Sequence, residues 1–107
     1  AILAANKKAT LVPLSVLEAI PEVLELAEAT GARGNRNSLS DSGVAVLTAR
    51  TAAMGAYYNV LINTAQIADA AFASEIRTKA DAVAAEVTKT CDRLDAWFTA
   101  ELRGSKG

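Results

Sequence analysis

Apolar residues recur at steps of three and four along the first 29 residues, which is the spacing of one face of an α-helix. A different face carries four glutamates between Glu18 and Glu28. The segment is therefore predicted to be an amphipathic helix. Its predicted core stripe is Val12, Val16, Ile20, Val23, Leu24 and Ala27.

Two prolines lie inside this segment. Pro13 and Pro21 each remove a backbone donor and crowd the carbonyl group four residues earlier. We expect the helix either to restart near Pro13, with Thr10 as its cap, or to be kinked.

The first helix is expected to end in a short turn. Gly31 and Gly34 can adopt positive φ, which ends a helix and leaves residues 32–37 as a loop. The next helix is expected to begin at Ser38 or Ser40, because a serine hydroxyl can accept a hydrogen bond from a free amide of the first turn. This start would place the following aspartate in the first turn, where the helix dipole favours its charged form.

The second predicted helix carries a strip of small and polar residues. At about 100° per residue, its members lie on one side within about 40° of one another. Alanine and glycine let another helix approach closely. Two asparagines one turn apart cost stability unless a partner or a ligand bonds their amides. The strip is Asp41, Ala45, Thr48, Ala52, Gly55, Asn59, Asn63 and Gln66, and the bulky side that is expected to pack is Leu47, Met54, Tyr57, Tyr58 and Leu61.

Asp41 and Asn59 lie too far apart for one helix to hold one small ligand between them. They are separated by 18 residues, or roughly 27 Å along a helix. Two such helices that cross antiparallel near Arg50 would bring Asp41 of one copy opposite Asn59 of the other. We therefore expect a two-fold homodimer with sites at the subunit boundary.

The last segment, from Asp69 to about Leu102, has no glycine or proline and repeats apolar residues at coiled-coil-like steps. Asp69 is the expected cap, and Asp92, Arg93 and Asp95 are expected to be solvated. Because no period-two pattern predicts a strand, the predicted class is all-α, with long antiparallel helices forming part of a helical bundle. The predicted stripe is Ile76, Ala80, Val83, Val87, Thr90, Leu94 and Trp97, extended by Phe72 and Phe98.

Composition narrows the classes of function. The 107 residues are 51% hydrophobic with a net charge of -1, which is typical of one folded domain or part of one. Basic residues are dispersed and aromatic residues are few, so nucleic acid is not an expected partner. No run is apolar enough to span a bilayer and no signal peptide is seen, so no membrane partner and a cytoplasmic location are expected. Without histidine, and with Cys91 alone, we expect no zinc site, and Cys91 is expected to be a small apolar core residue.

The first ten residues, AILAANKKAT, read like a helix already under way. This pattern is expected of a chain whose earlier portion is not part of the sequence. Long helices in a chain of this size need partner surface to cover their apolar faces, because ordering the backbone costs so much entropy. An oligomer is therefore expected.

Two motifs with fixed spacing carry a family resemblance. They are GNRNSLSDSGVAVL from Gly34 to Leu47 and GAYYNVLIN from Gly55 to Asn63. With KKATLVPL from Lys7 to Leu14 and IADAAF from Ile67 to Phe72, they resemble the formiminotetrahydrofolate cyclodeaminase family. Bacterial relatives in that family include methenyltetrahydrofolate cyclohydrolases of the same all-α fold.

The resemblance also implies that the N-terminal half of the family's domain is not part of this sequence. Nothing in the chain matches the Pro-Gly-Gly-Gly-Ser turn of the family's N-terminal half. Residues 1–103 are thus expected to be the C-terminal half of a cyclodeaminase-like helical domain, followed by a flexible tail at 104–107. Leu61 matches the bifunctional animal enzymes, which favours a cyclodeaminase that closes 5-formimino-tetrahydrofolate to 5,10-methenyl-tetrahydrofolate and releases ammonia. The alternatives are a methenyltetrahydrofolate cyclohydrolase and a non-catalytic helical dimerisation module.

The implied reaction assigns roles to residues. An acid must protonate the departing nitrogen and a base must take the N10 proton. Asp41 is the only acidic residue of the two spaced motifs, Gly34 to Leu47 and Gly55 to Asn63, so it is the predicted catalytic residue. The expected partner is a folate substrate, including polyglutamylated forms, with no metal or further cofactor, and Tyr57 and Tyr58 are candidates for stacking on it. The predicted substrate-binding residues are Asn35, Asn37, Ser40, Asn59, Asn63, Arg33 and Arg36, with Arg50 as a further candidate.

Overall fold

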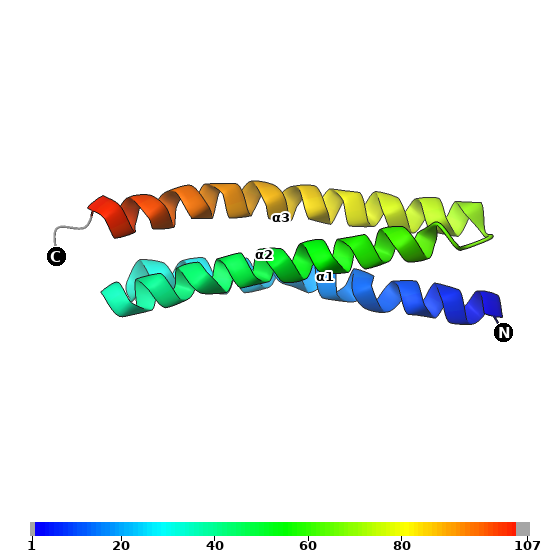
Figure 1. The fold of residues 1–107 in the computed structure, drawn as a ribbon, viewed down its shortest axis with the longest axis horizontal. Coiled ribbons are helices and arrows are strands. Elements are labelled where there is room, and N and C mark those ends of the chain that lie inside the picture. The colour runs from blue at the N-terminus through cyan, green and yellow to red at the C-terminus, as the bar shows by residue number, and fades with distance from the viewer. Residues whose placement is uncertain (1, 105–107) are drawn as a thin grey trace.

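The computed structural model describes the backbone of residues 2–104 and the side chains of residues 7–104. Three long helices follow one another: α1 (Ile2–Arg33), α2 (Arg36–Thr64) and α3 (Ala70–Gly104). They run alternately in opposite directions and lie side by side (Figure 1). Each helix contacts both of the others, and the molecule is elongated, with extents of 59 × 19 × 16 Å.

The all-α class is confirmed, because residues 2–104 contain helices and no strand. Gly104, predicted to open a flexible tail, is the last residue of α3. Residues 105–107 of the predicted tail lie outside the described residues. Within the described part of the chain, no helix is long and apolar enough to cross a membrane. In the same part, no cluster of three or more His, Cys, Asp or Glu side chains could hold a metal ion.

The core is built from one stripe on each helix. In α2, buried residues follow alternating steps of three and four, which keeps one face of a long helix against its neighbours. Small side chains at the middle of this stripe let α1 and α3 pack closely on α2. The buried residues of α2 are Leu39, Ser42, Val46, Ala49, Ala53, Ala56, Val60 and Thr64.

The predicted core stripe of α1 is only partly right. Ile20, Leu24 and Ala27 are buried. The rest of the core stripe comes from Leu14 and Leu17, each at most 4% exposed. Apolar residues occupy two adjacent stripes of α1, and only one of them faces α2 and α3. The other three predicted core residues, Val12, Val16 and Val23, are 61%, 44% and 42% exposed.

The predicted packing of α2 is only partly right. Its strip of small and polar residues lies along α1, where Asn63 donates to the Ala9 carbonyl, but no helix approaches Gly55 closely, since a Cβ added there would have nothing within 4 Å. Tyr57 of the bulky side packs against the core. On the predicted bulky side, Leu47 and Tyr58 are 52% and 64% exposed. The core stripe is a third face between these two, which the sequence does not distinguish because α2 is apolar around most of its circumference.

The stripe of α3 is largely confirmed. Ile76, Ala80, Val87, Leu94 and Phe98 are buried. Val83, Trp97 and Phe72 pack against the core from its margin. Cys91 is fully buried and Thr90, the predicted stripe residue beside it, is half-buried. Burial raises the pKa of the Cys91 thiol.

The predicted cap of α3 is also confirmed. The Asp69 carboxylate accepts a hydrogen bond from the Phe72 amide at 3.1 Å. It also forms an ion pair with Lys7 of α1 at 2.9 Å. The Lys7 hydrogen bond, assisted by the Phe72 amide, lowers the pKa of Asp69.

The first helix and the turn after it differ from their predictions. α1 continues through both prolines to Arg33, so of the two alternatives for Pro13 the restart capped by Thr10 is wrong. Thr10 is buried within the helix. Neither Gly31 nor Gly34 has φ in the left-handed region. Gly34 is needed for close approach instead, because an added Cβ would lie 2.4 Å from Cβ of Ser38.

The start of α2 also differs from its prediction. The helix begins at Arg36, and the cap is Asn35, whose side-chain oxygen accepts a hydrogen bond from the Ser38 amide at 3.0 Å. Asparagine is as good a cap as serine, so the motif offered several possible starts. Because the true start is earlier than predicted, Asp41 lies in the second turn.

Gly31 and Gly43 leave room for the ring of Phe98 at one end of the core. Phe98 of α3 is 4% exposed. A Cβ added at Gly31 of α1 would lie 2.8 Å from the Phe98 ring, whereas one added at Gly43 of α2 would lie 3.4 Å from it. The ring is therefore held between the two helices, with no spare room on the α1 side.

Asp92 and Arg93 of α3 are exposed, as predicted, and Asp95 is half-buried. All three also pair with the other helices. Arg50 of α2 contacts Asp92 at 2.9 Å and Asp95 at 3.4 Å. Arg93 binds both carboxylate oxygens of Glu28 on α1, at 2.8 and 3.0 Å. The hydrogen bond from Arg93 lowers the pKa of Glu28.

Gly31→Ala is expected to destabilise the protein. The new methyl group must displace a ring that Gly43 confines on the other side, and overpacking of this kind costs about 1–3 kcal/mol, more than the gain of about 1 kcal/mol in helix propensity. Gly43→Ala is the matched control and should be neutral or slightly stabilising, because its methyl group meets the same ring at ordinary contact distance. Urea denaturation of both variants measures the difference. Equal stabilities would contradict the proposed confinement of the ring.

The Glu28–Arg93 pair predicts a dependence of stability on pH. A carboxylate whose pKa is lowered by folding stabilises the protein above its ordinary pKa of 4.5, and this contribution is lost as the pH falls through the lowered value. Glu28→Gln should thus be less stable than the parent at pH 7, by less than about 1 kcal/mol because the pair is exposed. The difference in the free energy of unfolding between the two proteins should disappear in acid, as measured by urea denaturation at several pH values. Glu25→Gln, a control without this partner, should show no comparable gap, and a gap that widened in acid would be the contrary result.

Candidate functional site

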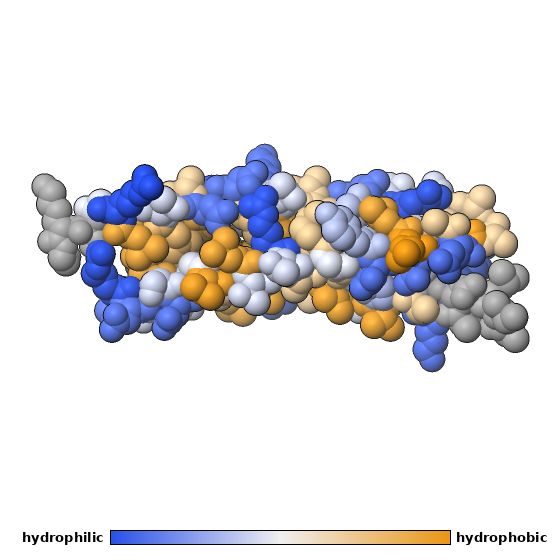
Figure 2. Space-filling view, in the orientation of Figure 1, coloured by the Kyte–Doolittle hydropathy of each residue, from blue (hydrophilic) through white to orange (hydrophobic). Residues whose placement is uncertain are grey.

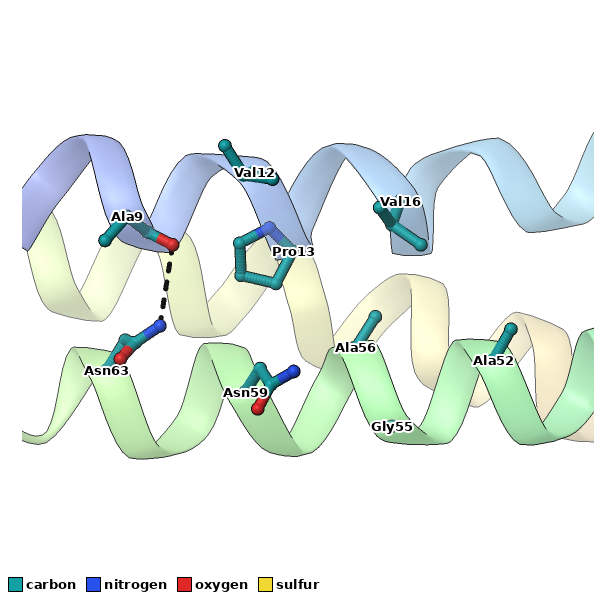
Figure 3. Close-up of a pocket in the computed structure, with 9 residues that line it drawn as sticks. All are labelled: Ala9, Val12, Pro13, Val16, Ala52, Gly55, Ala56, Asn59 and Asn63. Atoms are coloured by element: carbon teal, nitrogen blue, oxygen red, sulfur yellow. Dashed lines mark hydrogen bonds between the residues drawn. The ribbon is translucent and has the colours of Figure 1, made fainter.

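An open groove of about 470 Å³ lies between α1 and α2, next to the second motif. Figure 3 shows its two walls, with a proline and small or β-branched residues on α1 and two asparagines on α2. Two of the α1 residues in this wall, Val12 and Val16, were predicted to be core, so sequence reasoning missed their place in the groove. The lining residues are Ala9, Val12, Pro13, Val16, Ala52, Gly55, Ala56, Asn59 and Asn63.

Asn63 supplies a hydrogen bond that α1 lacks because of Pro13. Proline has no amide hydrogen, so the carbonyl group of Ala9, four residues earlier, loses its normal helical donor. The side-chain amide of Asn63 donates to this carbonyl across the helix pair, at 3.5 Å (Figure 3). This long hydrogen bond gives Asn63 a structural role beside the proline of α1.

Asn59 is placed differently. It lies one turn before Asn63 on the same wall, beside Pro13 in Figure 3. Its side chain is exposed and makes no hydrogen bond to the described residues. Its amide is therefore available to a ligand in the groove.

A second groove, of about 330 Å³, follows the same helix pair at its other end. Asp41 and Ser42 of α2 line it together with Val23, Leu26 and Thr30 of α1. Asp41 is exposed and has no hydrogen bond or ion pair within the described part of the chain. Like Asn59, it is a polar side chain that the fold itself does not use.

The two grooves cannot form one site within one copy. α2 is continuous from Arg36 to Thr64, so Asp41 and Asn59 are about 27 Å apart along it. The predicted separation of the two motif ends is thus confirmed. The two-fold arrangement expected to bring them together stays a prediction.

Most of the remaining predicted binding residues gather at the N-terminal end of α2. Asn35 uses its side-chain oxygen as the helix cap, and Ser40 donates to the carbonyl of Asn37 at 3.2 Å. Arg36 donates to the carbonyl of Leu102 at the end of α3, at 3.2 Å, and Arg33 is exposed in the last turn of α1. They lie at the Asp41 end of the molecule, away from Asn59.

Two further candidates are engaged elsewhere. Arg50 points to α3, where its ion pairs with Asp92 and Asp95 occupy it. Tyr57 donates a hydrogen bond to Asp81 of α3 at 2.6 Å, which raises the pKa of the tyrosine. Neither side chain faces the grooves between α1 and α2.

Comparison with known proteins gives consistent matches. The sequence profile of the family described as formiminotransferase-cyclodeaminase matches residues 1–82. The chain is 39% identical, over 84% of its length, to a methenyltetrahydrofolate cyclohydrolase of Methylorubrum extorquens, and covers 43% of that protein. It is 31% identical, again over 84% of its length, to a formimidoyltransferase-cyclodeaminase of Sus scrofa, and covers 17% of that protein. The chain therefore spans less than half the length of the curated relatives that it matches.

The asparagine pair gives a test of the groove's construction. Asn63→Ala should lower the free energy of unfolding by about 1 kcal/mol, because the Ala9 carbonyl loses its donor. Asn59→Ala, the control one turn away, should change stability by less than about 0.5 kcal/mol. In a Pro13→Ala background, the Ala9 carbonyl regains a backbone donor, so Asn63→Ala should cost much less. Thermal unfolding of the four variants measures this coupling, and purely additive effects would argue against it.

Proposed function

Because the chain belongs to the formiminotransferase-cyclodeaminase family, we propose that it forms part of an enzyme acting on the one-carbon unit of a tetrahydrofolate. The favoured reaction is hydrolysis of the 5,10-methenyl bridge, which is the activity named for the relative that is 39% identical. The M. extorquens relative is matched over 43% of its length, so the proposal concerns the whole enzyme of which these helices form one portion.

One observation carries this proposal. Both ends of the family motif present polar side chains that the fold leaves unused, Asp41 in one groove and Asn59 in the other. An exposed carboxylate and an amide on the walls of α1–α2 grooves are the groups that proton transfer and pterin recognition need.

The proposed step can be followed atom by atom. Water adds to the carbon that bridges N5 and N10, forming a carbon–oxygen bond. The carbon–N5 bond then breaks, leaving the formyl group on N10. Of the two water protons, one moves to N5 and the other leaves to solvent. Asp41 is proposed to accept a proton from the attacking water and to hand it on, a role that a carboxylate can fill in a chain without histidine.

The neutral and basic residues are proposed to bind the rest of the folate. The Asn59 amide both donates and accepts, as the edge of a pterin requires. Asn63 shares the groove, although its amide already serves Ala9. At the other end, Arg33 is exposed and unused by the fold, and guanidinium groups suit the carboxylates of a glutamate tail. Asn35, Arg36, Asn37 and Ser40 are placed to assist there.

A second candidate is the cyclodeaminase reaction, in which 5-formimino-tetrahydrofolate closes onto N10 and releases ammonia. The specific observation in its favour is the match to the S. scrofa protein, and the resemblance at Leu61 supports it. 5,10-Methenyl-tetrahydrofolate is the substrate of the hydrolysis and the product of the cyclodeaminase reaction. Both reactions need a proton-transfer group at the same carbon. A single absorbance assay of the methenyl group therefore separates them.

Asp41→Asn should reduce turnover by about 100-fold or more, because proton transfer by a positioned side chain contributes roughly that much. The assay supplies 5,10-methenyl-tetrahydrofolate to the whole enzyme and follows loss of its absorbance. A parallel reaction with 5-formimino-tetrahydrofolate detects its formation. Glu101→Gln, which removes an equal charge from the end of α3, should keep the parental rate, and far-ultraviolet circular dichroism should show intact helices in both variants. Near-normal turnover by Asp41→Asn would remove this residue from the proposed mechanism.

A further inference from the structure

Pro13 gives the groove beside the second motif a main-chain acceptor that a regular helix would not offer. In an unbroken helix the carbonyl group of Ala9 would bond the amide of the residue four positions later, but proline has no amide hydrogen. The oxygen of Ala9 therefore stays open on the side of α1 that faces α2. Ala9 and Pro13 both line the groove, and Figure 3 shows the oxygen pointing toward Asn63 on the opposite wall.

Asn63 uses only part of the capacity of this oxygen. Its amide nitrogen lies 3.5 Å away, which is longer than most protein hydrogen bonds. A carbonyl oxygen has two lone pairs, so it can accept a second hydrogen bond. Since Ala9 is exposed, a donor that enters the groove can reach the oxygen without displacing Asn63.

Three hydrogen-bonding groups gather at this end of the groove. The first is the Ala9 carbonyl. The second is the side-chain oxygen of Asn63, which is left as an acceptor because the nitrogen of the same amide is directed to Ala9. The third is the amide of Asn59, which makes no hydrogen bond within the described part of the chain and can donate. This end of the groove therefore offers two acceptors and a donor to one ligand.

The rest of the groove is apolar and open. In α1, Val12 and Val16 are 61% and 44% exposed. The facing wall of α2 is made by Ala52 and Gly55, and a Cβ added at Gly55 would have nothing within 4 Å. Figure 2 shows the same mixture of pale, orange and blue atoms along the surface of the molecule. A flat ring can lie on the apolar part of the groove with its polar edge toward Ala9.

We propose that Pro13 determines which ring the groove accepts, by keeping the Ala9 carbonyl open to an N–H donor of the ligand. Because this inference rests on the proposed function, the ring is a pterin, which carries an amino group at C2, an N–H at N3 and a carbonyl group at C4. The Ala9 carbonyl accepts from the amino group, and the Asn63 oxygen accepts from the adjacent N–H. The Asn59 amide donates to the carbonyl group of the ring. Pro13 acts through Ala9, so it is a positioning residue.

Pro21 provides a matched control within the same helix. It lies about two turns after Pro13, in a hollow between α1 and α3 that Val87 and Thr90 also line. The carbonyl group that loses its donor there belongs to Leu17, which is fully buried. Pro21 thus makes the same change to the backbone of α1, but away from the groove.

Binding of a stable folate to the whole enzyme tests the acceptor. 5-Formyl-tetrahydrofolate has the pterin edge but no methenyl bridge or formimino group, so neither proposed reaction consumes it. Its 2-desamino analogue lacks the amino group that the Ala9 carbonyl is proposed to bind. The parent enzyme should bind the analogue about 10-fold or more weakly, because an acceptor left without its donor costs affinity. Isothermal titration calorimetry measures both affinities.

Pro13→Ala should weaken binding of 5-formyl-tetrahydrofolate by about 10-fold and remove the preference over the analogue, because the new amide takes the Ala9 oxygen. Pro21→Ala should keep the parental affinity and preference. Lactic acid at position 13, the ester counterpart of alanine, again lacks an N–H and should restore the preference. It also decides the question if Pro13→Ala binds neither compound, since the two variants have the same side chain.

A parent enzyme that binds both compounds equally would overturn the proposal and leave the proposed function standing. A Pro13→Ala variant that keeps the preference would also overturn it. If the alanine and lactic acid variants both lost the preference, the cause would be the shape of α1 rather than the open carbonyl group, which again contradicts the proposal. A parent enzyme that binds no tetrahydrofolate would instead count against the proposed function, and the inference would fall with it.

Discussion

The constraint on which the structure depends is the scarcity of charge on α2. A helix of 29 residues with no exposed charge after Asp41 must find apolar or hydrogen-bonding surroundings on every side. The chain supplies these on one side, where Ala49, Ala53 and Ala56 pack against α1 and α3. A second side lines the two grooves toward α1. A third side, with Val44, Tyr58 and Ile62, is exposed in the described part of the chain.

Pro13 and Asn63 show how fold and site are connected. The proline leaves a carbonyl group without a donor, and the asparagine satisfies it from α2. The contact joins the two walls of the groove, and Asn59 lies one turn away with its amide unused by the described residues. The motif that identified the family thus contains one asparagine that builds the groove and another that is proposed to bind in it.

The sequence predicted most of the fold and only part of the site. The period of α3 and its cap at Asp69 followed from spacing, because that helix has one apolar face and charges elsewhere. α2 and α1 carry two adjacent apolar stripes, so Val12, Val16 and Val23 were assigned to the core, although they are exposed. Asn35 as the cap was missed since Ser38 and Ser40 are equally good candidates. The loss of a donor at Pro13 was recognised, but only the structure shows that Asn63 replaces it.

Distances between spin labels in two copies test most directly the prediction that two α2 helices form one site. With antiparallel helices that cross near Arg50, labels at Ser40 should lie about 32 Å apart and labels at Leu47 about 13 Å apart, given 1.5 Å per residue and helix axes ~10 Å apart. Electron–electron double resonance on singly labelled protein measures both. Two equal short distances would indicate parallel helices, and no distance between copies would indicate a monomer. Either result would contradict this prediction.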